Sequence, residues 1–376
     1  MFMLEIVQGW ITIQLTDSAF WVGAVAAFAG VFSVVMSLPG GVLADRFQRW
    51  KIVVFSNVII ALSVVLMALA VFSGRIYIWQ IIMLAIVSGS VGGIRGTSSL
   101  VLTLDVVGKN NLLKAIAANF GANSIAGVFA PIIAGYVMRW WGIAWSYLGI
   151  VFAELVASGL LLVMSRRHRR FPDVDIPSSN SWELLKSGAR YVVSSPLIMS
   201  LILMGVVMES FAWSHQSMMP VMARKVLDLG ADGFGQLRSA CFIGLLLGTG
   251  VISIIGVGKQ KGLVLMLGSI AFCICMIFFS MSRIFPLSLL ILALAYAMGA
   301  TYDTTLSALI QTSVPAKIRG RVVSFQTMTW GLSGASGFYM GPIASIFGAP
   351  MSIIMGSVVA LLYLVFAFPT VKRIKD

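Results

Sequence analysis

The chain has 376 residues, of which 59% are hydrophobic and only 10% are charged, and its mean hydropathy is +0.98. A water-soluble globule of this length needs more polar surface, so composition excludes a soluble domain. The net charge of +13 does not indicate a nucleic-acid-binding protein, because the basic residues are spread over short loops and form no single stripe. The chain is predicted to be a polytopic membrane protein.

The apolar runs indicate helices. Residues 288–300 are apolar on every side, whereas the strands of a membrane barrel alternate apolar and polar residues. The three cysteines, Cys241, Cys273 and Cys275, lie inside apolar runs without a CxxC spacing, and the chain has two histidines. We therefore expect an all-α protein with no disulfide, no metal site and no cofactor.

Charged and Pro/Gly punctuation divides the chain into eleven complete spans. In chain order they cover residues 20–41, 52–73, 76–104, 115–138, 144–164, 196–222, 234–256, 262–282, 285–312, 322–346 and 349–368. Each is close to the ~20 residues that a helix needs to cross a bilayer core. Residues 1–15 are also mostly apolar, but at 1.5 Å per residue they reach only about 22 Å, which is part of a span.

The basic residues predict the orientation of the chain. When the loops are assigned to alternating sides, most Lys and Arg residues fall on the side that holds residues 165–195 and the C-terminus. The opposite side receives only Arg75, Arg139, Arg224, Lys225, Arg238 and Arg283, and Arg95 remains inside a span. The positive-inside rule makes the first side cytoplasmic.

The long polar segment 165–195 divides the chain into two similar halves. It contains the basic run Arg166-Arg-His-Arg-Arg170 and a possible amphipathic helix over residues 182–193. We interpret it as a cytoplasmic linker between bundles at 1–164 and 196–371, with a tail at 372–376. Binding of anionic membrane lipid by its basic run is a compatible alternative.

The two halves resemble each other. A shift of 207 residues places Gly92 on Gly299 and Thr97 on Thr304, and a shift of 211 places Ala130-Pro131 on Gly341-Pro342. These matches occur in the same order and suggest a duplicated bundle of six plus six helices related by a pseudo-two-fold axis.

A short charged turn lies between the spans 20–41 and 52–73. Its sequence, Gly-Val-Leu-Ala-Asp-Arg-Phe-Gln-Arg-Trp-Lys over residues 41–51, resembles the signature that follows the second helix in the major facilitator superfamily. Gln48 and Trp50 depart from that signature, and the matching positions are Gly41, Leu43, Ala44, Asp45, Arg46, Arg49 and Lys51.

Further segments fit the same family frame. Pro315-Ala-Lys-Ile-Arg319-Gly-Arg321 resembles the loop before helix eleven, and Gly258-Lys-Gln-Lys261 resembles a degenerate second copy of the charged turn. Gln14-Leu-Thr-Asp-Ser-Ala is similar to the end of helix one in the branch of bacterial siderophore exporters and macrolide efflux proteins. In this frame the chain has a twelve-helix plan, with helix one only partly present because of a misplaced start or a truncated copy.

The resemblance implies a secondary active transporter that works by alternating access. We expect proton-coupled efflux of a small amphipathic compound, such as a drug or a siderophore, by a monomer in the bacterial inner membrane. The alternatives are metabolite uptake and a non-transporting sensor or truncated copy. A membrane enzyme is not expected, because the chain lacks the HExxH, GxSxG and Walker patterns.

Ionisable residues inside spans are costly and therefore indicate function or a partner. The resemblance places Arg95 in helix four and Asp303 in helix ten, where they could face each other across the central cavity and exchange a proton. The alternative is a static ion pair or two uncoupled groups. Glu154, in the span matching helix six, is a weaker candidate for proton coupling, and a hydrogen-bonded or neutral structural acid is the favoured interpretation.

Helix seven carries a polar face. Glu209, Trp213 and Gln216 follow an i, i+4, i+7 pattern, which could receive an amphipathic or cationic substrate, or which could lie at the outer interface. Gln14 is a further candidate for the cavity, Glu5 would face it from helix one, and His215 is expected to be structural.

The resemblance also implies two devices for conformational change. Gly41, Asp45, Arg46, Arg49 and Lys51 are expected to form a conformational latch, in which Asp45 accepts hydrogen bonds from the start of a neighbouring helix or pairs with an Arg across the bundle. The alternative is a loop that only fixes orientation. Small residues and prolines are expected to bend and pack two gating helices, at Pro131 and Gly135 and at Gly337, Gly341 and Pro342.

Overall fold

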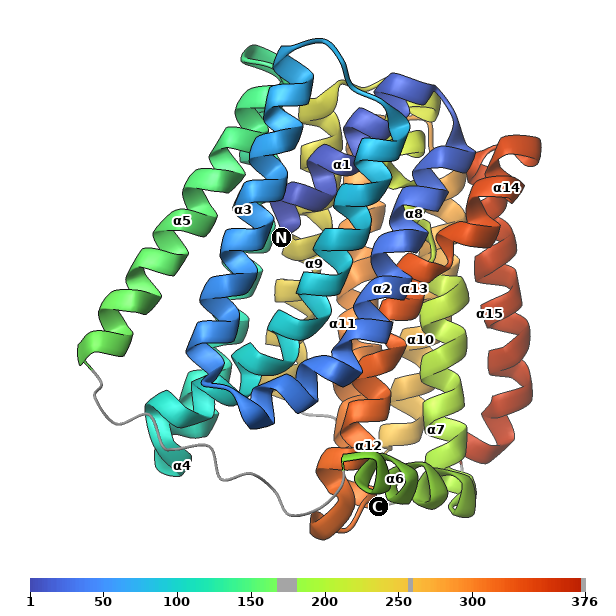
Figure 1. The fold of residues 1–376 in the computed structure, drawn as a ribbon. Helices are drawn as coiled ribbons and strands as arrows, with labels where there is room; N and C mark the ends of the chain where they lie inside the picture. The colour runs from blue at the N-terminus through green and yellow to red at the C-terminus, as the bar shows by residue number, and fades with distance from the viewer. Residues whose placement is uncertain (168–180, 256–259, 373–376) are drawn as a thin grey trace.

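The computed structural model describes residues 1–167, 181–255 and 260–372, and these residues fold entirely as helices and short connections (Figure 1). The elements in chain order are α1 (Phe2–Thr16), α2 (Ala19–Arg46), α3 (Arg49–Phe72), α4 (Ile78–Trp140), α5 (Ile143–Arg167), α6 (Ser181–Ser194), α7 (Pro196–Val207), η1 (Met208–Ala212), α8 (His215–Val221), η2 (Met222–Val226), α9 (Ala231–Ile255), α10 (Lys261–Met281), α11 (Phe285–Ser313), α12 (Ala316–Thr329), α13 (Gly331–Ala335), α14 (Gly337–Phe347) and α15 (Ala349–Lys372). The expected all-α membrane fold is confirmed.

Ten helical stretches of the described chain are long and apolar enough to cross a membrane. They correspond to ten of the eleven predicted spans. The exception is the span 322–346, which the structure divides among α12, α13 and α14. Its sequence contains Gly331, Gly334, Gly337 and Gly341. Glycine weakens a helix interior because it loses more conformational entropy on folding than other residues do.

The helix α4 contains two predicted spans, 76–104 and 115–138, in one 63-residue helix. Its two ends, Ile78 and Trp140, both lie away from the linker, so the chain reverses direction within α4 (Figure 1). Because the helix is continuous from Ile78 to Trp140, the predicted break between the two spans is wrong. No proline or Asn-Gly turn signal stands between Leu104 and Ala115 to end the helix.

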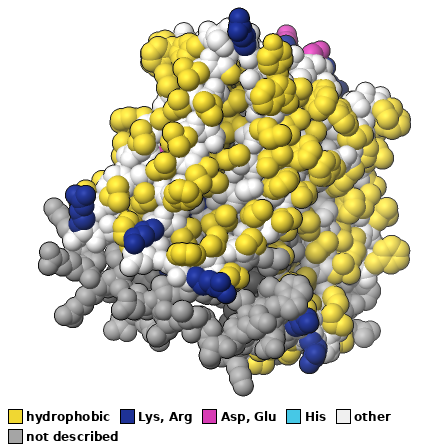
Figure 2. Space-filling view, in the orientation of Figure 1, with side chains coloured by type: hydrophobic (Ala, Val, Ile, Leu, Met, Phe, Trp, Pro, Cys, Tyr) yellow, Lys and Arg dark blue, Asp and Glu magenta, His cyan; other side chains and the backbone are white. Residues whose placement is uncertain are grey.

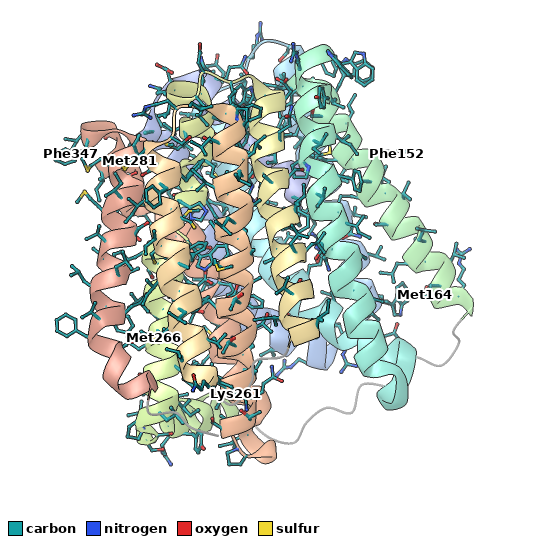
Figure 3. The ribbon with its side chains drawn as sticks, turned by 180° about the vertical axis from the view of Figure 1, so that it is seen from behind. Phe152, Met164, Lys261, Met266, Met281 and Phe347 are labelled. Carbon is teal, nitrogen blue, oxygen red and sulfur yellow. The ribbon has the colours of Figure 1, made fainter. Side chains whose placement is uncertain are left out.

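The outer surface of the bundle is apolar. In Figure 2 hydrophobic side chains cover most of the visible face, and the Lys and Arg side chains lie at the edges of this area. Phe152 points outward from α5 (Figure 3) and is 72% exposed, and Phe366 on α15 is 81% exposed. Trp140, Trp141 and Trp145 are also exposed, close to one end of the bundle. Lipid on the apolar face and aromatic side chains at its rim explain this exposure.

The structure places the linker-side elements at one end of the molecule. The helix α6 lies at the same end as the C-terminus (Figure 1) and covers the predicted helix 182–193. In Figure 3, α10 runs upward from Lys261 at this end to Met281 at the opposite end. The basic residues Arg169 and Arg170 lie outside the described residues.

We refer to the described residues before the linker as the N-terminal half and to those after it as the C-terminal half. Within the described chain the halves meet mainly where α2 packs on α13 and α14 and where α4 packs on α9. Glycine permits close approach at both contacts. A Cβ on Gly23 would lie 2.5 Å from the carbonyl oxygen of Gly337, and a Cβ on Gly135 would lie 2.7 Å from that of Ala231.

Candidate functional site

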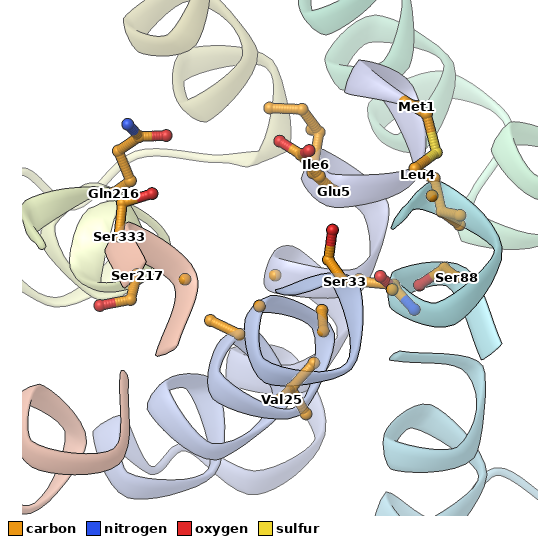
Figure 4. Close-up of a pocket in the computed structure, with 18 of the residues that line it drawn as sticks. Met1, Leu4, Glu5, Ile6, Val25, Ser33, Ser88, Gln216, Ser217 and Ser333 are labelled. Atoms are coloured by element: carbon orange, nitrogen blue, oxygen red, sulfur yellow. The ribbon is translucent and has the colours of Figure 1, made fainter. Parts of the chain in front are cut away.

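A cavity of about 280 Å³ lies between the two halves (Figure 4). In the figure Glu5, Ser33 and Ser88 of the N-terminal half lie on one side, and Gln216, Ser217 and Ser333 of the C-terminal half lie on the other. Apolar side chains of α2, α9 and the residue before α13 complete the wall, namely Val22, Val25, Phe234 and Trp330. A wall of apolar surface with few polar groups is typical of a small-molecule site.

An ion pair joins the two halves at this central cavity. Arg238 on α9 is 8% exposed, and its guanidinium Nη2 lies 3.2 Å from the Glu5 carboxylate on α1. Its Nη1 also donates to Gln216 Oε1 at 3.4 Å. Among the lining residues that the structure describes, Glu5 and Arg238 are the only side chains with a formal charge.

The position of Arg238 corrects the sequence prediction, which counted it among the residues of the outer loops. It lies in the second turn of α9, inside the span that begins at Ala231. The predicted span 234–256 already contained Arg238, so the rule that an ionisable residue in a span needs a partner could have identified it. Glu5 was expected to face the cavity and does line it, but no sequence pattern indicated its pairing with Arg238.

One polar atom at the central cavity has no partner among the described residues. The side-chain amide nitrogen of Gln8 is buried without a hydrogen-bond acceptor, and Gln8 lines the central cavity beside Leu4 and Glu5. A buried donor without an acceptor is costly and uncommon in native structures.

A second ion pair lies within the N-terminal half. Arg95 Nη1 on α4 lies 3.1 Å from Glu154 Oε2 on α5 and donates to Asn57 Oδ1 on α3 at 3.1 Å. This contact replaces the expected contact of Arg95 with Asp303 across the cavity, which is therefore corrected. The physical reason is proximity, because α3, α4 and α5 pack together in one half and Glu154 is the carboxylate that they bring to Arg95.

Asp303 instead lies near Glu209. Glu209 is 5% exposed in the π-helical segment η1, and Asp303 is partly buried on α11. The two carboxyl groups are close enough to interact electrostatically. The described residues place no Lys or Arg in an ion pair with either of them. A π-helical turn inside a span frequently marks a functional position, and here it carries one of the two acids.

Trp213 lies in an aromatic cluster inside the C-terminal half. Its ring stacks on Phe272 at 4.7 Å between centroids and meets Tyr296 edge-on at 5.0 Å. The buried His215 lies 3.2 Å from the Tyr296 hydroxyl and 3.0 Å from the Ala212 carbonyl, so both ring nitrogens have partners. Of the predicted face of Glu209, Trp213 and Gln216, only Gln216 lines the central cavity.

Gln14 lies at the end of the bundle away from the linker. It lines a separate outer pocket together with Arg139 and Asp232, so the expectation that it faces the central cavity is corrected. Arg139 on α4 and Asp232 on α9 form an ion pair at 2.5 Å across the halves. Lys225 on η2 and Asp17, after α1, form a second one at 3.1 Å.

The predicted latch residues lie around the two-residue turn Phe47-Gln48 between α2 and α3. Arg46 and Lys51 are exposed, and Arg49 Nε donates to the Ala44 carbonyl oxygen at 3.1 Å. Gly41 has open space where a Cβ would lie. The side chain of Asp45 lies outside the described residues, so its role stays a prediction.

The predicted gating positions lie where the halves meet. Pro131 and Gly135 on α4 face Gly235 and Ala231 of α9, while Gly337 and Gly341 on α14 face Gly23 of α2. Pro342 lies inside α14. The structure thus places these residues at contacts whose geometry any relative movement of the halves must change; their function in gating stays a prediction.

Comparisons with known proteins fit this arrangement. The chain is 24% identical over 360 residues to the Enterobactin exporter EntS of Escherichia coli O1:K1 / APEC, which covers 94% of this chain and 85% of that protein. The same identity and coverage are found with the Enterobactin exporter EntS of Shigella boydii serotype 18.

Solved structures share the fold. A bacterial homolog of the human lysosomal transporter Spinster, in an inward-facing and unoccupied conformation, matches with a TM-score of 0.76 at 14% identity and covers 98% of this chain and 94% of that one. The nucleoside transporter NupG matches with a TM-score of 0.71 at 15% identity and covers 100% and 97%. The family model described as Major Facilitator Superfamily matches residues 1–338. The chain therefore belongs to the Major Facilitator Superfamily, as a multi-pass membrane transporter and not an enzyme.

Proposed function

We propose that this chain is a proton-coupled exporter of a small amphipathic compound, working by alternating access in the bacterial cytoplasmic membrane. The observation that carries the proposal is the central cavity between the halves, whose wall is mostly apolar but contains the Glu5–Arg238 pair. The similarity to proteins named as enterobactin exporters supports the outward direction.

The placement of the inter-half contacts supports alternating access. The two ion pairs Arg139–Asp232 and Lys225–Asp17, with the close approach of Gly23 to Gly337, lie toward the end away from the linker. If the basic linker side is cytoplasmic, as the positive-inside rule indicates, these contacts close the outer side. In the proposal, residues 1–164 and 196–371 rock about the central cavity while 165–195 connects them.

The proton site is proposed at Glu209 and Asp303. A carboxyl group inside a membrane span is costly to charge without a cation, so this pair is proposed to take up and release the coupled proton. Arg95 and Glu154 compensate each other inside the N-terminal half and are proposed to be secondary to this site.

The test is transport in cells that lack their own drug and siderophore pumps. The chain is expressed, a panel of amphipathic compounds is added, and intracellular accumulation is measured with and without a proton uncoupler. Lower accumulation that the uncoupler abolishes is the expected result. Higher accumulation in expressing cells would instead support uptake, and unchanged accumulation of every compound would support a sensor or an inactive copy.

Proteoliposomes then separate coupling from direction. The purified chain is reconstituted with a proton gradient imposed in either sense, and the movement of the compound found in cells is followed. Export coupled to protons requires that the compound move against the proton flow. Transport at a rate independent of the proton gradient would contradict proton coupling, and the chain would then be a facilitated transporter.

A further inference from the structure

We propose that the central cavity selects amphipathic anions, and that Arg238 binds the anionic end of the substrate by exchanging Glu5 for it. This inference rests on the proposed transport function, because it names the substrate class of the same cavity. The observations that carry it are the burial of Arg238, the exposure of its partner, and the position of both in the wall of the central cavity.

The two members of the ion pair differ in how firmly they are held. The side chain of Arg238 is 9% exposed, and it also contacts Gln216 Oε1 and the sulfur of Met219, both in its own half. The side chain of Glu5 is 58% exposed and belongs to the other half. The cation is therefore fixed in the C-terminal half, and the carboxylate is the partner that another anion can replace.

Replacement of Glu5 by a substrate anion would matter for alternating access. Glu5 and Arg238 lie on different halves, so their separation changes whenever the halves move. A buried guanidinium that loses its carboxylate is strongly unfavourable. An anionic group that travels in the central cavity with Arg238 removes this cost, so that a bound anion lowers the free energy needed for the halves to move.

Several other polar groups of the wall are engaged within the protein, because Ser88, Ser217 and Ser333 donate their hydroxyl hydrogens to backbone carbonyls. The amide nitrogen of Gln8 lacks an acceptor, and Gln216 already directs its side-chain oxygen to Arg238. The apolar residues Val22, Val25, Phe234 and Trp330 would receive the non-polar body of the substrate. At about 280 Å³ the central cavity suits a compact ring system.

The same geometry argues against a cationic substrate. The acid and the aromatic ring that sequence spacing offered for a cation, Glu209 and Trp213, do not line the central cavity, and Trp213 is covered by Phe272 and Tyr296. Glu5 is the one carboxylate in the wall, and a cation that bound it would leave Arg238 unpaired.

The test is equilibrium binding to the purified full chain in detergent. Three probes share one ring and differ in their head group: 2-naphthoate, 2-naphthamide and 2-naphthylmethylamine. We expect 2-naphthoate to bind about tenfold more tightly than the amide, and the amine to bind most weakly. In Arg238→Gln this preference should vanish, in Arg238→Lys part of it should remain, and in Glu5→Gln naphthoate should bind more tightly than in the unmodified chain.

Arg283→Gln is the matched control, because Arg283 is an exposed arginine in the turn after α10. It should leave all three affinities unchanged. Tighter binding of the amine, a naphthoate preference that survives Arg238→Gln, or no measurable naphthoate binding by the unmodified chain would overturn the inference. Binding is measured here without transport. Uptake instead of export in the proteoliposome assay would therefore contradict the export proposal but not this inference.

Discussion

At the residue scale, Arg95 and Glu154 depend on each other. Both are largely shielded from solvent, and they lie 3.1 Å apart within the N-terminal half. Removing one partner leaves an uncompensated charge in the membrane, so Arg95→Leu should lower the stability by about 3–5 kcal/mol. The double variant Arg95→Leu/Glu154→Leu should recover most of this loss. Thermal unfolding of the purified chain measures both, and a double variant as unstable as the single one would contradict the pairing.

The carboxyl pair of Glu209 and Asp303 gives a different kind of prediction. If Asp303 carries the coupled proton, Asp303→Asn removes the exchange but keeps the shape of the side chain. Proton-driven export should fall to background, while exchange of labelled for unlabelled substrate across the membrane should continue. Asp228→Asn, at an exposed acid of the outer end, is a control for the loss of an acid. Gradient-driven export by Asp303→Asn would exclude it as the proton carrier.

The sequence identified the costly residues but not their partners. Arg95, Glu154, Glu209 and Asp303 all stand out as ionisable groups in apolar spans. Their pairing depends on which helices are neighbours and how each is rotated, and no local pattern encodes that. Arg95 therefore pairs with Glu154 and not with Asp303. The pair of Glu5 and Arg238 became evident only from the contact between the halves.

At the element scale, the packing of α2 on α14 is set by glycine. A Cβ at Gly23 would already lie 2.5 Å from the Gly337 carbonyl oxygen, so Gly23→Leu must push the two helices apart, at a cost of about 1–3 kcal/mol. We expect the outer side to open. The distance between spin labels at Arg75 and Arg283, one on each half, should increase.

Gly159 provides the control for this substitution. A Cβ on Gly159 meets no atom within 4 Å, so Gly159→Leu adds the same side chain without a clash. Its label distances should match those of the unmodified chain. Unchanged distances in Gly23→Leu as well would show that the glycine contact does not determine the closure of the outer side.

The charged turn between α2 and α3 supplies a prediction from its motif. Asp45→Asn should impair transport, because the amide lacks the negative charge and the second acceptor oxygen that the predicted latch uses. Membrane insertion should be normal, because the positive charges that fix orientation remain. Transport and membrane abundance are measured in the same cells, and normal transport would leave the turn with a role in orientation only.

Hydropathy predicted the elements well where the lipid determines them. Ten predicted spans have a counterpart because each exposes an apolar surface of membrane length. The break of residues 322–346 into α12, α13 and α14 was missed, because its glycines are tolerated in a span and the break depends on the packing against α2. The continuity of α4 was missed because the polar residues after Leu104 resemble a loop although they can also form a helix.

At the scale of the whole molecule, the packing within each half differs from the contacts between the halves. Within each half, helices pack through buried apolar side chains such as Ile60 in the N-terminal half and Phe272 in the C-terminal half. Between the halves, the described contacts include glycine approaches, aromatic pairs such as Trp10–Phe234, side-chain hydrogen bonds and three ion pairs. The outer pairs Arg139–Asp232 and Lys225–Asp17 are exposed and contribute little each, so the outer end of the interface can open and close at a cost that substrate and proton binding can meet.

The outer ion pair of Asp17 and Lys225 tests this view of the whole molecule. In a background without Cys241, Cys273 and Cys275, the double variant Asp17→Cys/Lys225→Cys is treated with a short bis-maleimide, which ties the halves where the charges now lie 3.1 Å apart. Alternating access requires this end to open, so transport should stop. Binding of 2-naphthoate should persist, because the central cavity keeps its present shape. Single-cysteine variants treated with the same reagent should transport normally, and transport by the cross-linked protein would mean that substrate crosses without separation of the outer ends.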